Sequence, residues 1–238
     1  MPNLKHGEVT QLMADSWDAD KDNRERALED LRFVSGDGQW TDSEKTSRGD
    51  AACLTINRLS PVVSQVVNDI KQAQAAIQVF PVDSEENIGT AEIYEGLIRQ
   101  IEFRSKAQSV YGYGAWCSVA CGIGHWRLET DFTTDSVFEQ EIKIKRVLDP
   151  NAVVWDPSSY EIDRSDAGFC FVTELVHKTS FKKRFGREFT PTDVASGNSD
   201  GIDWHDSDFA RIAEYFYTEL EDRNFVLTSD GQTIDITD

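Results

Sequence analysis

The residues of this chain that could do chemistry are few, and their spacing matches no common type of site. The candidate thiols and imidazoles are Cys53, Cys117, Cys121 and Cys170, with His6, His125, His177 and His205. None of them forms a C-x-x-C pair or falls at the spacing of zinc ligands. Cys117 and Cys121 lie four apart on a predicted helix, so they share a face and could be a redox pair or half a metal site. We favour two small buried apolar residues, which is how reduced cysteine commonly behaves.

Four acidic residues crowd a predicted loop between two strands, and they are Asp156, Glu161, Asp163 and Asp166. Carboxylates so close together could bind a divalent cation and support a metal-dependent hydrolase. The spacing lacks the regular ligand order and the central glycine of a calcium-binding loop. We therefore favour solvated acids that stabilise turns, as aspartate commonly does.

A dense basic patch follows this loop, and it consists of Lys178, Lys182, Lys183, Arg184 and Arg187. It could contact an acidic patch on a neighbouring subunit, or it could be one solvated helix face with cations near the helix C-terminus. Both interpretations stay open, and direct contact with DNA ranks behind them because the rest of the chain is so acidic.

The remaining motifs do not support catalysis. His125 lies on the polar side of a predicted strand and has no nucleophile or carboxylate that the sequence places beside it. Gly122 and Gly124 lack the third glycine of a nucleotide-binding loop, so we expect them to end a helix and to allow close packing. No G-x-S-x-G motif is present. We therefore predict no catalytic residue, no cofactor site and no metal site, and a protein that is not an enzyme.

Composition indicates a folded protein with a strongly acidic surface. The chain has 238 residues, of which 39% are hydrophobic, and a net charge of −19. Residues 190–238 carry 2 basic and 12 acidic residues. Such a surface disfavours a stable grip on DNA phosphates; it suits a protein that lets DNA pass, or it serves solubility alone. No segment has the length of a membrane span and the N-terminus has no apolar signal core, so we expect synthesis in the cytoplasm.

The first half of the chain has helical periodicity. A first helix is predicted from Glu8 to Phe33, with a possible break in the charged stretch Asp18–Glu25, and a polar loop from Thr41 to Asp50. Asn57 or Ser60 would cap the next helix, with Pro61 at its first position. Its apolar stripe is expected to consist of Val63, Val66, Val67, Ile70, Ala73 and Ile77.

An edge strand is predicted at Ile77–Val82, because Pro81 cannot donate a backbone hydrogen bond within a sheet. A further helix should begin near Glu86, and Ser105 could cap a second segment that ends at Gly122. The apolar face of the helix near Glu86 is expected to consist of Ile93, Leu97, Ile98 and Ile101.

From Gly124 the apolar period changes to two residues, which is typical of strands. The stretch from Trp126 to Ile144 predicts an antiparallel hairpin with one wet face. Shorter strands are expected at 152–155 and 169–175, a helix at Thr179–Phe185, a polar stretch at 190–208, and a final pair of strands at 209–220 and 225–236. The fold class is therefore α+β, with a helical part over residues 1–123 and an antiparallel β-rich part over 124–238.

Six segments of the chain follow one another in an order that resembles the portal proteins of tailed bacteriophages, of the type found in short-tailed phages of enteric bacteria. They are Phe33–Trp40 (FVSGDGQW), the run from Asn57 (NRLSPVVSQVVNDIKQ) to Asp83 (IQVFPVD), Gly96–Phe103 (GLIRQIEF), Gly122–Leu128 (GIGHWRL), Glu141–Pro157 (EIKIKRVLDPNAVVWDP) and Arg211–Tyr217 (RIAEYFY). No segment is specific by itself, but six in order cover nearly the whole chain.

This resemblance implies a structural protein of the virion that forms a ring, dodecameric in assembled particles, at one capsid vertex. The ring would nucleate head assembly with scaffolding and capsid proteins, dock the terminase large subunit, pass DNA without sequence-specific binding, and bind tail or head-completion proteins. The matched segments correspond mainly to the outer wing. Portal chains of this type are longer, with a stem, clip and crown beyond the matched region, so we expect a truncated N-terminal portion.

Two other functions remain possible from the sequence. The first is an acidic, monomeric module that binds a protein partner and has no role with DNA. The second is the metal-dependent hydrolase that would use the acids of residues 156–166.

Overall fold

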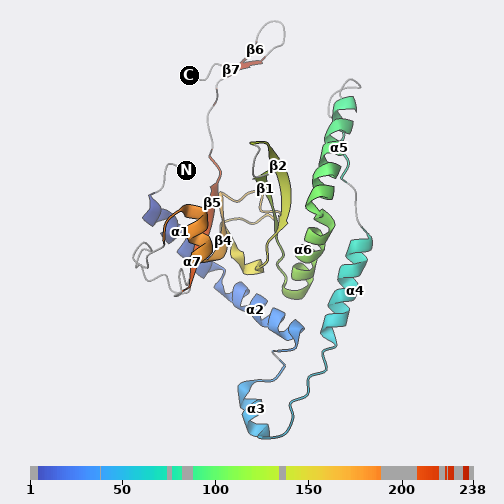
Figure 1. Ribbon diagram of the computed structural model, residues 1–238, viewed down its shortest axis with the longest axis vertical. Coiled ribbons are helices and arrows are strands. Elements are labelled where there is room, and N and C mark those ends of the chain that lie inside the picture. Colours follow the sequence, from blue (N-terminus) through green and yellow to red (C-terminus); the bar gives the residue numbers. More distant parts are fainter. Residues whose placement is uncertain are drawn as a thin grey trace. The chain divides into compact units, whose positions relative to one another are not determined.

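The computed structural model describes residues 5–37, 39–73, 77–81, 88–133, 138–188, 208–219, 223, 225–227 and 233–235 (Figure 1). Helices occupy most of the first half of the chain and antiparallel strands follow, which confirms the predicted α+β class. The chain divides into two compact units, which we describe separately. The helix–hairpin unit is Lys21–Ala152, and the split unit combines Met1–Asp20 with Val153–Asp238.

The helices and strands have the following bounds. The helices are α1 (His6–Ala19), α2 (Lys21–Ser35), α3 (Asp42–Arg48), α4 (Leu59–Gln72), α5 (Ile88–Ser105), α6 (Ala107–Cys121) and α7 (Lys178–Phe185). The strands are β1 (Trp126–Phe132), β2 (Gln140–Arg146), β3 (Val153–Trp155), β4 (Phe169–His177), β5 (Phe209–Tyr217), β6 (Phe225–Leu227) and β7 (Thr233–Asp235). A short 3-10 helix, Pro150–Ala152, precedes β3.

Helix α6 is the centre of the helix–hairpin unit because it is apolar on all sides and carries no charged residue. Its buried residues include Val110, Cys117 and Ala120, each of which belongs to a different apolar cluster. A helix without charges is normally well covered, and here α2, α4 and the β1–β2 hairpin pack on it, while the polar Gln108, Ser109 and Ser118 stay exposed. In Figure 1, α5 and α6 follow one another as an almost continuous column beside this hairpin.

The glycines around the end of α6 have the structural role that the sequence predicted. Gly122 has a φ of 79° and ends the helix in the left-handed conformation, where a side chain would be strained. Gly124 lies so close to α6 that a β-carbon on it would overlap the carbonyl oxygen of Gly114. Termination and close packing therefore explain these residues.

The β1–β2 hairpin has one charged face and one apolar face. Its register pairs Leu128 with Ile144 and Glu129 with Lys143, so like residue types face the same way. On the charged face, Lys143 lies 3.3 Å from Asp131 and 3.1 Å from Glu141. The predicted hairpin with a polar face is thus confirmed, and its apolar face packs on α6 through the buried Ile144.

The split unit contains the three-stranded antiparallel sheet β3–β4–β5, and α1 packs against it. The core of this unit combines Met13 of α1 with Val154, Phe169 and Phe171 of the sheet. Tyr215 stacks on Phe171 with ring centroids 4.8 Å apart. The predicted strands at 152–155 and 169–175, the strand beginning at 209, and the helix at 179–185 are confirmed within one or two residues.

Helix predictions need three local corrections. The first helix is divided at Asp20, inside the charged stretch where a break was possible. The polar stretch 41–50 is not a loop throughout, because Thr41 and Glu44 form a capping box that begins α3. Asn57 does accept from the backbone of Leu59 and Ser60, both at 3.1 Å, but α4 begins at Leu59, so Pro61 is its third residue.

Other corrections concern segments whose partners lie far away in the sequence. Residues 77–81 of the strand predicted at Ile77–Val82 do not form a strand, and Val82 lies outside the described residues. Ser105 does not cap α6; its hydroxyl instead accepts from the backbone of Ile144 at 3.0 Å. The segment 225–236 does not pair with β5, because β6 and β7 pair with each other. The polar stretch 190–208 lies almost wholly outside the described residues.

Candidate functional site

The carboxylates of the 156–166 loop are used by the loop itself. Asp166 accepts from the Ser159 hydroxyl and the Tyr160 backbone, both at 2.6 Å. Asp156 accepts from the Ser158 hydroxyl at 2.6 Å and from the Gly168 backbone at 3.0 Å. In the part of the chain that the structure describes, no three acidic, histidine or cysteine residues are arranged to hold a metal ion. The arrangement is that of acids that shape turns.

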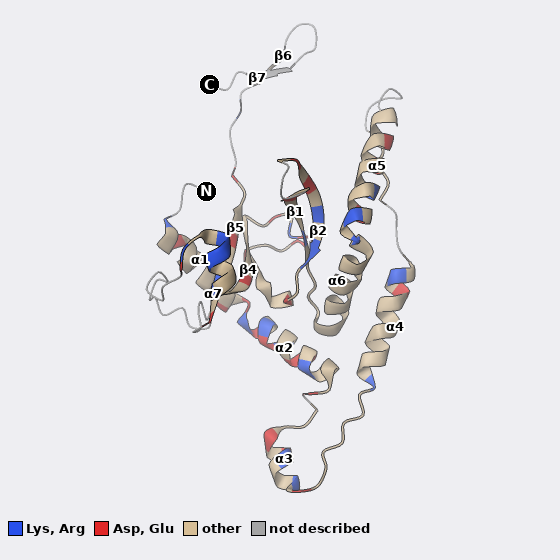
Figure 2. Cartoon of the chain, in the orientation of Figure 1, with Lys and Arg blue, Asp and Glu red and all other residues tan. Residues whose placement is uncertain are grey.

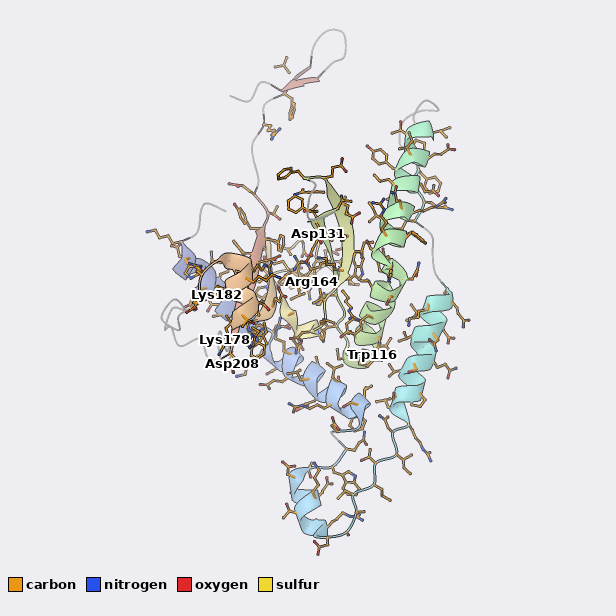
Figure 3. The ribbon with its side chains drawn as sticks, in the orientation of Figure 1. Trp116, Asp131, Arg164, Lys178, Lys182 and Asp208 are labelled. Atoms are coloured by element: carbon orange, nitrogen blue, oxygen red, sulfur yellow. The ribbon has the colours of Figure 1, made fainter. Side chains whose placement is uncertain are left out.

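These hydrogen bonds also set the acidity of the loop. The Ser159 hydroxyl, followed by the Tyr160 amide, lowers the pKa of Asp166. Burial acts to raise the pKa of Asp156, but the hydrogen bonds from Ser158 and Gly168 outweigh it and the pKa is lowered. Arg164, labelled in Figure 3, donates to the Ser159 carbonyl at 2.9 Å. Both aspartates are therefore held in the charged form at neutral pH.

The basic patch on α7 is largely neutralised by acids of the same unit. Lys178 pairs with Asp208, and Figure 3 labels both residues together with Lys182. Lys182 lies 2.7 Å from Glu188, and Arg184 lies 3.1 Å from Glu174. Such exposed pairs add little stability, but they cancel the positive field that a phosphate backbone would need. This patch therefore has little capacity to grip DNA.

The cysteines Cys117 and Cys121 are buried apolar residues, as the sequence favoured. The Cys121 thiol donates to the Cys117 carbonyl at 3.2 Å, and burial raises the pKa of both thiols. Burial also raises the pKa of Cys170 to about 11. Thiols that stay protonated at neutral pH are poor nucleophiles and poor metal ligands.

His125 lies just before β1, not within it, and is partly buried. The sequence predicted it on the polar side of a strand, and the strand in fact begins one residue later, at Trp126. Both of its neighbours contact α6. Gly124 lies against the backbone of Gly114, and the Trp126 ring packs edge-on against the Tyr111 ring. The segment around His125 therefore joins the helix to the hairpin.

Two groups of exposed apolar side chains stand out in the helix–hairpin unit, and two of these residues, Val66 and Ile70, were placed on the apolar stripe of a helix by the sequence. The first is the exposed part of the apolar stripe of α4, next to the buried Val63 and Val67, and it consists of Leu59, Val62, Val66 and Ile70. The second is the part of the apolar hairpin face that stays exposed beside the buried Ile144, and it consists of Trp126, Leu128, Phe132 and Ile142. Val66 and Ile70 were predicted to be buried, yet 41% and 47% of their surfaces are exposed.

Helix α5 requires the same correction. Ile93 and Leu97 were predicted to lie on its apolar inner face, but they are 72% and 48% exposed, and Ala91 is buried instead. The signal that could have revealed these surfaces is an excess of apolar positions over one helix face. Clustered exposed apolar side chains are typical of proteins that associate with other proteins.

The geometry thus describes an α+β chain with apolar association surfaces, acids that stabilise turns and internally paired cations. Residues 10–238 match the family described as phage P22-like portal protein. Because this match spans most of the chain, the chain belongs to that family, and the resemblance seen in the sequence is confirmed. Portal proteins are structural, head–tail connector proteins of bacteriophages that are associated with DNA packaging and located at a capsid vertex of the virion.

Proposed function

We propose that this chain is the wing-forming part of a portal subunit, and that copies of it assemble into a ring at one capsid vertex. DNA would pass through the ring during packaging and ejection. The observation that carries this proposal is the family match over residues 10–238, and the exposed apolar surfaces support it because ring subunits need faces for their neighbours. The division into parts 1–123 and 124–238 remains our proposal for the organisation of the wing.

The ring size and the binding partners are part of the same proposal. The ring would be dodecameric, would assemble with scaffolding and capsid proteins, and would dock the terminase large subunit and the tail or head-completion proteins. The chain would be made in the cytoplasm of the bacterial host. The charge of −19 supports passage of DNA without retention, because an acidic wall repels phosphates. Among the described residues, no helix is both long and apolar enough to cross a bilayer.

Native mass spectrometry and negative-stain imaging of the purified chain test this function. The expected result is a closed oligomer with rotational symmetry. A monomer at all concentrations up to about 100 μM would instead support the alternative, an acidic monomeric module that binds another protein.

The metal content of the purified chain tests whether the acidic loop of residues 156–166 serves a metal-dependent hydrolase. Asp163 accepts from the Ser165 backbone at 3.1 Å, so its oxygen serves a turn. We expect no bound divalent metal in the purified chain and no change on Asp163→Ala. Stoichiometric metal that disappears in this variant would support the hydrolase interpretation.

A further inference from the structure

Strand β1 forms an open edge of the β1–β2 hairpin. Its register with β2 runs without interruption from Trp126, opposite Arg146, to Phe132, opposite Gln140. As far as the chain is described, this sheet consists of two strands, so β1 is paired on one side only. A proline, a bulge or a covering element often protects such an edge. The seven residues of β1 include no proline, and no bulge interrupts their register.

The hydrogen-bond pattern shows which backbone groups of β1 point away from β2. Just past the end of β1, the Thr133 N–H donates to the Glu139 carbonyl at 2.9 Å, so this pair is hydrogen-bonded. Hydrogen-bonded and non-bonded pairs alternate along an antiparallel ladder. The even-numbered residues of β1 therefore direct their N–H and C=O groups to the open edge, and they are Trp126, Leu128, Thr130 and Phe132.

The outer edge of β2 follows the same alternation, but this edge is covered. The Ile144 N–H points away from β1 and donates to the Ser105 hydroxyl at 3.0 Å, and α5 packs on this side of the hairpin (Figure 1). On β1, the Phe132 N–H donates to the Asp131 carboxylate at 3.0 Å. Among the described residues, no other hydrogen bond reaches the N–H and C=O groups on the open edge. Such groups form a template for a further strand.

Apolar side chains flank the open edge on one face of the hairpin. This face packs on α6 through Ile144, and Trp126 contacts Tyr111. Leu128 and Phe132 are nevertheless 62% and 50% exposed. Side chains of a central strand have cross-strand neighbours on both sides, whereas those of an edge strand have them on one side. Apolar residues of an added strand would therefore cover Leu128 and Phe132.

Carboxylates flank the same edge on the other face, where Figure 2 shows blue and red segments along the hairpin beside the tan α6. Glu129 lies 2.7 Å from Arg127 and 2.6 Å from Lys145. Asp131, nearer the hairpin end, lies 3.3 Å from Lys143, and its side chain is 47% exposed. A cation on an added strand could therefore reach Asp131 from the open side, and opposite charges on neighbouring strands stabilise their pairing.

We propose that β1 binds an extended segment of another protein as a third, antiparallel strand in which apolar residues alternate with basic or neutral polar ones. Antiparallel addition continues the hairpin and gives the more stable ladder. A second copy of this chain is a poor source of such a segment, because its strand-like residues 225–236 include two aspartates and no basic residue. Copies that each carry −19 also repel one another, whereas a basic segment is attracted. This inference goes beyond the proposed ring and holds whether or not the ring forms.

Hydrogen exchange measured by NMR tests the open edge in the purified chain. The amides of Leu128 and Thr130 point to this edge, and those of Arg127 and Glu129 point to β2. The first pair should exchange at least about tenfold faster than the second. Equal protection of the two pairs would show that the edge is already covered, and this result would overturn the inference.

A labelled peptide of sequence TIKIKIT tests strand addition by fluorescence anisotropy. In an antiparallel ladder its isoleucines lie on the apolar hairpin face and bond to the even-numbered residues of β1, while its lysine amides point to solvent. N-methylation of the isoleucines should therefore weaken binding at least about tenfold, and N-methylation of the lysines should leave it unchanged. The side chains and the charge are the same in both peptides. Any other pattern, or no binding up to about 1 mM, would overturn the inference.

Thr130→Pro tests the same contact from the side of the chain. Proline removes the N–H that points to the open edge and keeps the bonds of β1 to β2, which is where an edge strand tolerates it. This variant should retain the far-UV circular dichroism of the natural chain and bind the peptide at least about tenfold more weakly. Thr130→Val keeps the N–H and is the matched control, which should bind like the natural chain. If Thr130→Pro unfolds, the two methylated peptides decide; a folded Thr130→Pro that binds normally overturns the inference.

Discussion

At the scale of single residues, Asp166 shows how an acid can stabilise a turn without binding a cation. Hydrogen bonds from Ser159 and Tyr160 lower its pKa below the ordinary value of 3.8. A group with a lowered pKa in the fold stabilises the fold above its unfolded pKa, and this contribution is lost as pH falls through the folded pKa. Acid should therefore loosen the loop as the pH falls below about 4.

The corresponding prediction concerns Asp166→Asn. This variant should melt at a lower temperature than the natural chain at pH 7, and the difference should shrink as pH falls toward 3. Circular dichroism melts at several pH values measure it. Glu25→Gln, on the exposed surface of α2, is the control and should melt like the natural chain throughout. A difference that stays constant with pH would contradict the role of the ionised carboxylate.

A second prediction at this scale concerns thiol reactivity. Burial raises the pKa of Cys117, Cys121 and Cys170, the last to about 11, so their thiolate fractions at pH 8 are small. Cys53 lies outside the buried core and is partly exposed. Titration of the folded chain with a disulfide reagent should give one fast thiol, and Cys53→Ser should remove that phase. Two or more fast thiols would contradict the protection expected for Cys117, Cys121 and Cys170.

At the scale of elements, the contact between Gly124 and α6 predicts a strong sensitivity to one methyl group. Gly124→Ala should destabilise the chain by about 1–3 kcal/mol, because the new β-carbon overlaps the rigid backbone carbonyl of Gly114. Gly96→Ala is the matched control, since a β-carbon there meets nothing within 4 Å. Removing a glycine from the interior of α5 should stabilise it by about 0.5–1 kcal/mol. Urea unfolding measures both; equal effects of the two changes would contradict the packing argument.

Local patterns were sufficient to predict most elements. The period of two located β1, β2 and β4, and the capping residues of α4 located its start within two residues. The failures lie where pairing is decided by distant segments. Residues 225–236 were predicted as one strand, yet their described residues form two short strands, β6 and β7, that pair with each other. The alternation of apolar residues predicts a strand but does not show which other strand it pairs with.

The candidate site was less predictable for a related reason. Apolar residues of α4 predict burial, but they do not say which face the unit covers. Only the packing of Val63 and Val67 on α6 shows that Val66 is left outside. The cysteines were easier to interpret, because small residues four apart on an apolar helix are commonly buried together.

At the scale of the whole molecule, the charge of −19 predicts poor retention of DNA. Lys178, Lys182 and Arg184 are paired with acids, so no strong basic patch offsets the overall repulsion. In a fluorescence anisotropy titration at 150 mM salt, a labelled 20-base-pair duplex should show no binding up to about 10 μM protein. Binding below 1 μM that weakens steeply with salt would contradict the prediction.

The same charge predicts how assembly depends on salt. If copies associate through exposed apolar side chains such as Val62 and Val66 of α4, the contact is apolar and the main opposing force is repulsion between acidic subunits. Raising the salt from about 0.02 M to 0.5 M shortens the screening length severalfold and should strengthen assembly. If the basic patch around Lys183 instead bound an acidic patch on the neighbour, salt would weaken assembly. Sedimentation across this range separates the two contacts, because their salt dependences have opposite signs.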